Sequence, residues 1–152
     1  MKNKTHSVRK RKLIAIIFGV LAIVFGVILF LKVDAPHHLG EYFTKAYYGQ
    51  FGAIAICVEL LAAAYYLFIG HKKTNFAMAL FAFTVALNGI LNLLGLGTSS
   101  IPIFIMLVFL VSGGIAFYIA FSNAFNSGKI LIRNVIFSFV LGNIIAFYFN
   151  YF

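Results

Sequence analysis

The hydrophobic residues of this chain are arranged in five long runs that short polar segments separate. The runs are 13–31, 51–69, 76–96, 102–121 and 131–149. Each is close to the roughly 20 residues that an α-helix needs to cross the core of a bilayer. Membrane strands are disfavoured, because the runs are too long and do not alternate apolar with polar residues. The pattern predicts an all-α fold, a polytopic membrane helix bundle with five transmembrane helices.

Turn-forming residues separate the third run from the fourth. Gly95 and Gly97 are suited to ending the third helix, and Ser99 or Ser100, followed by Pro102, is suited to starting the fourth. We therefore expect these two helices to form a tight hairpin.

A basic segment, KNKTHSVRKRK, precedes the first run. The run that follows has 19 residues, more than the hydrophobic part of an ordinary secretory signal, so we expect it to be retained as a helix. The chain then divides into a basic cytoplasmic tail, residues 1–12, and a single transmembrane helical domain, residues 13–152.

The composition supports a membrane location. The chain is 63% hydrophobic and 10% charged, whereas a soluble domain carries about 25% charged residues. The net charge of +9 does not indicate nucleic-acid binding, because the basic residues lie in short segments without interleaved aromatic residues. The single cysteine, Cys57, excludes a disulfide within the chain and a redox pair.

The basic residues also predict the orientation, since cytoplasmic segments are enriched in Lys and Arg. Ten of them lie in the tail, in the second break, and in the fourth break with the start of the fifth run: Lys2, Lys4, Arg9, Lys10, Arg11, Lys12, Lys72, Lys73, Lys129 and Arg133. The first break instead pairs Lys32 and Lys45 with Asp34 and Glu41. We predict a cytoplasmic N-terminus and, after five crossings, a C-terminus on the outside.

Small residues recur at helical spacing in every run, where close backbone approach would let helices associate in lipid. The expected contact stripes are Ala15, Gly19, Ala22, Gly26; Gly52, Ala55, Glu59, Ala62, Tyr66; Ala79, Ala82, Ala86, Gly89; Ser112, Ala116, Ala120; and Ser138, Gly142, Ala146. Glu59 lies in the middle of its stripe, so we expect it to face other helices.

Further polar residues lie at a similar depth in the later runs. A cluster of Glu59, Asn88, Ser112 and Asn143 is geometrically feasible, and Asn92 lies one turn beyond Asn88 on the same face. With no basic residue at that depth, burial disfavours the charged carboxylate. We expect Glu59 to be largely protonated at neutral pH unless water or a ligand cation reaches it.

Glu59 has two interpretations. It is either a protonated carboxyl that donates a structural hydrogen bond, worth about 1 kcal/mol, or a proton-transfer or ligand-binding group, as ionisable residues inside membranes often are. Asn88, Asn92, Ser112 and Asn143 would belong to the same ligand or proton site.

The outer loop contains an HHxxE pattern formed by His37, His38 and Glu41. If that loop were helical, it could supply two or three metal ligands, whereas zinc normally takes four, or three plus water in a catalytic site. We interpret the histidines as interfacial loop residues and expect no metal site. No catalytic motif, phosphate-binding loop or nucleophile with a matching base is present in the sequence, so we favour a non-enzymatic role. An integral membrane enzyme is a third alternative, although no acid–base pair lies within one helix turn.

Four features follow one another over residues 32–90: Lys32 at the end of the first helix, a second helix carrying VELLAAAYYLFIG, the basic turn HKKTN and the Ala-rich FAMALFAFTVAL. In these features the stretch resembles the DoxX-like superfamily of small bacterial membrane proteins. The resemblance implies that Glu59 is the acidic position of the family and that Lys72 or Lys73 forms its basic turn. It also implies a link to quinol- or thiol-dependent redox complexes, although the family usually has four crossings.

These observations predict a multi-pass accessory subunit of a quinol/thiol redox or stress-response complex in a bacterial cytoplasmic membrane. Its ligand would be a quinone or a lipid, and its partners membrane lipids and a membrane or soluble protein, without nucleic acid. The alternative is a small transporter or proton-coupled channel that uses Glu59, in which a homo-oligomer lines the pathway.

Overall fold

The computed structural model describes residues 2–96 and 101–151, and the side chains of residues 6–96 and 101–150. Five long helices fill most of the chain: α1 (Lys2–Phe30), α3 (Gly52–Ile69), α4 (Thr74–Leu93), α5 (Ile103–Ser122) and α6 (Ile132–Tyr151). A 3-10 helix, η1 (Leu39–Phe43), and a short helix, α2 (Lys45–Gly49), lie between α1 and α3. Within the described ranges, no residue is in a strand. The all-helical fold and the five predicted helices are confirmed.

Each long helix has the length and composition of a membrane span. The helix bounds fall within two or three residues of the predicted runs, with one exception. Helix α1 begins at Lys2 rather than near residue 13, so the basic segment is helical and continuous with the first apolar run.

Helix ends follow local signals. Gly70 ends α3 in the left-handed conformation (φ 70°), and the His71 N–H donates back to Tyr66 O at 3.0 Å. Gly95 (φ 68°) follows α4 in the same conformation, as predicted. Only a residue without a Cβ adopts this geometry freely. Pro102 caps α5, while Gly97, Ser99 and Ser100 lie outside the described residues.

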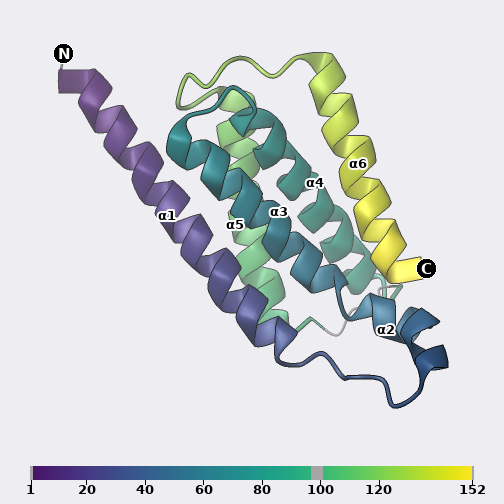
Figure 1. Ribbon diagram of the computed structural model, residues 1–152. Coiled ribbons are helices and arrows are strands. Elements are labelled where there is room, and N and C mark those ends of the chain that lie inside the picture. The colour runs from purple at the N-terminus through teal and green to yellow at the C-terminus, as the bar shows by residue number, and fades with distance from the viewer. Residues whose placement is uncertain (1, 97–100, 152) are drawn as a thin grey trace.

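Helix α4 is the central element of the bundle. It packs against α3, α5 and α6, while α1 packs mainly against α3. Figure 1 shows α1 and α6 along opposite edges. Phe83 shows how α4 contacts two helices at once. Its ring meets those of Phe117 on α5 and Phe139 on α6 edge to face, at 6.2 and 5.3 Å between centroids.

The stripes of small residues are confirmed in three helices. Those of α5 and α6 are buried throughout, and in α1 the stripe faces α3, where a Cβ on Gly26 would lie 3.6 Å from Cys57 Cβ. In α4 the stripe holds except at Ala86, which is exposed.

The stripe predicted for α3 is confirmed only in part: Glu59 faces α4 as expected, but the stripe is not the most buried face of the helix. Ala62 is exposed, and Gly52, Ala55, Glu59 and Tyr66 are only half-buried. The buried face of α3 consists of Ala53, Ile56, Cys57, Leu60, Ala63, Ala64 and Leu67. Because alanines occur on several faces of this helix, their spacing did not single out the one that packs.

The three basic segments come together at one end of the bundle. The Arg11 guanidinium donates to Phe68 O at 3.4 Å, beside the end of α3. Lys72 and Lys73, in the turn after α3, line the same pocket as Lys129 and Arg133. In Figure 1 the N-terminus, the α3–α4 turn and the α5–α6 loop lie at one end, and α2 and the C-terminus at the other.

Candidate functional site

The carboxyl group of Glu59 lies in the middle of the bundle, on the side of α3 that faces α4. Although the residue as a whole is half-buried, both carboxyl oxygens are buried. Neither has a hydrogen-bond partner among the described residues. A buried carboxyl without a partner loses the hydration that it had in water, and this is costly whether the group is neutral or charged.

Thr84, on α4, is the polar side chain that faces this carboxyl. Its hydroxyl donates to Leu80 O, one turn back along α4, at 3.1 Å. A hydroxyl has one proton to donate but two lone pairs, so Thr84 Oγ1 can still accept a hydrogen bond. A protonated Glu59 could therefore donate to Thr84 after a small adjustment, whereas an ionised one would compete with Leu80 O for the only proton.

Helix α6 reaches the same depth because Gly142 has no side chain. A Cβ at this position would lie 2.8 Å from Thr84 Oγ1 and 3.1 Å from Thr84 N. The two backbones therefore approach more closely here than any larger residue allows. Thr84 of α4 therefore lies between the buried carboxyl of Glu59 on α3 and the backbone of α6 at Gly142.

The asparagines form a second polar group, about one turn nearer the end of the bundle that carries α2. Asn92 Nδ2 donates to Asn88 O at 2.8 Å, and Asn150 Nδ2 donates to Asn88 Oδ1 at 3.2 Å. Asn88 and Asn150 are 5% and 2% exposed. The structure thus brings Asn88 and Asn92 together, as their spacing predicted, and links them to α6.

Sequence reasoning missed Asn150. The signal was present, because Ser138, Gly142, Ala146 and Asn150 follow one another at steps of four residues. The stripe of small residues on the last helix therefore continues to the asparagine, on the face that packs against α4.

The other two residues of the predicted site are not hydrogen-bonded to the carboxyl of Glu59, whose oxygens have no partner in the described part of the chain. Ser112 is buried on α5 (3% exposed), and Asn143 is half-buried beside Gly142. Whether Glu59, Asn88, Asn92, Ser112 and Asn143 serve a ligand or a proton remains a prediction.

The HHxxE loop is organised by a hydrogen bond within itself. The His37 N–H donates to Glu41 Oε2 at 2.9 Å, which orders the entry to η1. Over residues 2–96 and 101–151, no three His, Cys, Asp or Glu side chains are grouped as metal ligands would be. The Glu41 carboxylate therefore accepts a hydrogen bond from the backbone of its own loop.

The fold and these contacts define a helical protein with five helices of membrane-spanning length and a buried carboxyl on α3 that faces the central helix, α4. Comparison with protein families, curated proteins and solved structures gives no match to the chain.

Proposed function

We propose that the protein is a five-crossing integral protein of a bacterial cytoplasmic membrane, with its N-terminus in the cytoplasm and its C-terminus outside. The basic segments support this orientation, because they gather at one end of the bundle and cytoplasmic ends are enriched in Lys and Arg. The opposite end carries Lys32 and Lys45 together with both loop acids, Asp34 and Glu41.

The orientation can be tested with two single-cysteine variants in a Cys57→Ala background. Lys10→Cys and Lys32→Cys replace exposed residues on either side of the apolar run 13–31, about 33 Å apart at 1.5 Å per residue. An impermeant maleimide added to intact cells should label Lys32→Cys only, and cell lysis should expose Lys10→Cys. Labelling of both in intact cells would contradict a membrane span in α1.

Within this placement, we propose a non-enzymatic role as an accessory subunit of a quinol- or thiol-dependent redox complex, similar to the DoxX-like superfamily. The observation that carries this role is the buried carboxyl of Glu59, which faces Thr84 of α4, where Gly142 of α6 packs against the same threonine. As a neutral donor, Glu59 would fix the contact of these helices and so the surface that the bundle offers to a partner.

Glu59→Gln tests this role, because glutamine keeps a hydrogen-bond donor but cannot exchange a proton. As an accessory subunit the variant should fold and still copurify with its partners after mild solubilisation. Glu41→Gln, the same change in the outer loop, is the matched control. Loss of the partners from Glu59→Gln alone, with folding unchanged, would show that the acid itself is needed for association. If the wild type copurifies with no protein, the accessory role is wrong.

A proton-coupled transporter is the second candidate, and the lack of a hydrogen-bond partner favours it. Both Glu59 oxygens are free of hydrogen bonds to the described residues, and a carboxyl that exchanges protons must not be held in one state. In proteoliposomes, a proton flux that Glu59→Gln abolishes and Glu41→Gln preserves would support transport. Equal flux in empty liposomes would exclude it.

A further inference from the structure

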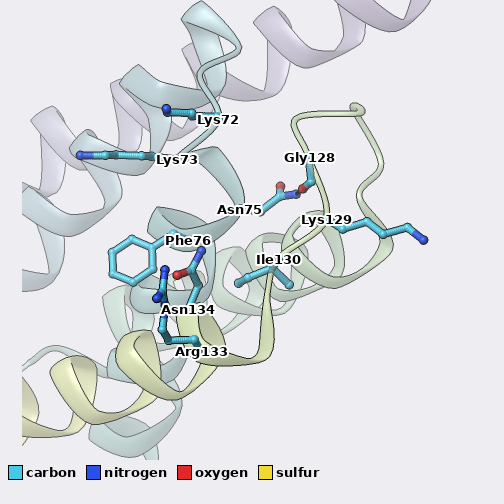
Figure 2. Close-up of a pocket in the computed structure, with 9 residues that line it drawn as sticks. All are labelled: Lys72, Lys73, Asn75, Phe76, Gly128, Lys129, Ile130, Arg133 and Asn134. Atoms are coloured by element: carbon cyan, nitrogen blue, oxygen red, sulfur yellow. Dashed lines mark hydrogen bonds between the residues drawn. The ribbon is translucent and has the colours of Figure 1, made fainter.

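A pocket of about 500 Å³ opens at the basic end of the bundle, away from Glu59. Its walls come from the α3–α4 turn, from the start of α4, and from the end of the α5–α6 loop with the start of α6 (Figure 2). Four of the residues that line it are cationic: Lys72, Lys73, Lys129 and Arg133.

The charge of this pocket is not compensated within the chain. None of its lining residues is acidic, and the three acids of the whole sequence lie at the opposite end or in the middle of the bundle. Two helices, α4 and α6, also begin at the pocket, and their first N–H groups add to its preference for an anion. Cationic residues that line a cavity without a counter-charge favour a ligand with more than one anionic oxygen.

The wall of the pocket is held in place before any ligand binds. Asn75, only 3% exposed, donates from Nδ2 to Asn123 Oδ1 at 3.1 Å and to Gly128 O. These bonds fasten the α5–α6 loop to the start of α4, and Figure 2 shows the Asn75 amide beside Gly128. Because the loop is already ordered, binding costs less conformational entropy than at a free loop.

The pocket combines this charge with apolar surface. Phe76 and Ile130 lie among its lining residues, and Ile136, Phe137 and Val140 leave the adjoining turns of α6 about half exposed, at 57%, 62% and 45%. A free inorganic anion would gain nothing from this surface, whereas a phospholipid would place its phosphate among the cations and its acyl chains along α6.

We propose that this pocket binds the phosphate headgroup of an anionic phospholipid. The proposal rests on the membrane placement proposed above, but it assigns a site that neither Glu59 nor the asparagine group provides. Lys73 and Arg133 are the two cations to alter, because they come from different walls of the pocket. In Figure 2 the side chain of Lys129 extends away from the other lining residues.

The test uses the full chain in phosphatidylcholine mixed micelles, with phosphatidylglycerol as the probe and native mass spectrometry to measure the bound fraction. Lys73→Gln combined with Arg133→Gln should weaken binding about thirtyfold, which corresponds to about 1 kcal/mol for each charge and 1.4 kcal/mol for each factor of ten. The charge-preserving pair Lys73→Arg and Arg133→Lys should stay within about threefold of the wild type.

The matched control is Arg9→Gln with Lys10→Gln, which removes one Arg and one Lys from the same end of the protein but outside the pocket. This control should change binding less than about threefold. Equal losses in the two pairs, or no loss in the pocket pair, would overturn the proposal, because the attraction would then be non-specific.

Competition with inorganic phosphate distinguishes a phospholipid headgroup from free phosphate as the ligand of the pocket. At millimolar concentration inorganic phosphate should not displace phosphatidylglycerol, and if it binds as tightly, the pocket is a site for free phosphate instead. Because binding is measured in micelles, this outcome is independent of the labelling experiment on cells, which tests the membrane placement alone.

Discussion

A Gly142→Ala substitution would place a methyl group at the contact between α6 and α4. Its Cβ would lie 2.8 Å from Thr84 Oγ1, 3.1 Å from Thr84 N and 3.2 Å from Leu80 O. The hydroxyl could rotate away, but the other two atoms belong to the backbone of α4. Helix α6 must therefore move outward by several tenths of an ångström before these contacts become ordinary.

The size of the effect follows from two opposing terms. Alanine is the better helix former, by about 1 kcal/mol for a glycine in the interior of a helix. Overpacking at a close contact costs about 1–3 kcal/mol, and here the displaced helix also loses packing around Ser138 and Ala146. We expect a net loss of about 1–2 kcal/mol in the free energy of unfolding.

Gly114→Ala is the matched control, because Gly114 also lies inside a long helix, α5, but its added Cβ would meet nothing within 4 Å. Only the helix-propensity term applies there, so this variant should be equal to the wild type or more stable. Both variants can be purified in the same detergent, and SDS-driven unfolding followed by circular dichroism gives the two free energies. If Gly142→Ala proves as stable as Gly114→Ala, the close approach of α4 and α6 at this depth is wrong.

Three further substitutions test other contacts of the bundle. Gly70→Ala forces alanine into a left-handed conformation and against the Arg11 guanidinium, so it should cost about 1–2 kcal/mol of stability in SDS unfolding. The loss should be smaller in an Arg11→Ala background, and an unchanged loss would refute the contact. Asn150→Leu removes the donor to Asn88 Oδ1 of α4 and should cost about 1 kcal/mol of stability, more than Asn143→Leu in the same titration. Equal costs would contradict a stabilising hydrogen bond between Asn150 and Asn88. Asn75→Leu releases the α5–α6 loop, so amides 123–130 should exchange with deuterium faster in nanodiscs than those of the α3–α4 turn, and unchanged protection would show that another contact holds the loop.

The sequence alone determined the helices and the distribution of charge. Length and hydropathy are local properties, so the five runs predicted the five long helices, and Gly95 predicted the end of α4 through its own backbone freedom. The basic residues indicated which ends of the helices belong together, because alternating crossings place the tail and the second and fourth breaks at the same end.

The tertiary structure decided which helix faces touch. In α3 nearly every residue is apolar, so several faces were equally suitable for packing, and Ala63 and Ala64 were buried where Ala55 and Ala62 had been expected. The partner of Asn88 depended in the same way on how α6 lies against α4. Only side-chain packing between helices fixes their rotation and register, and that information is not contained in the hydropathy of any one helix.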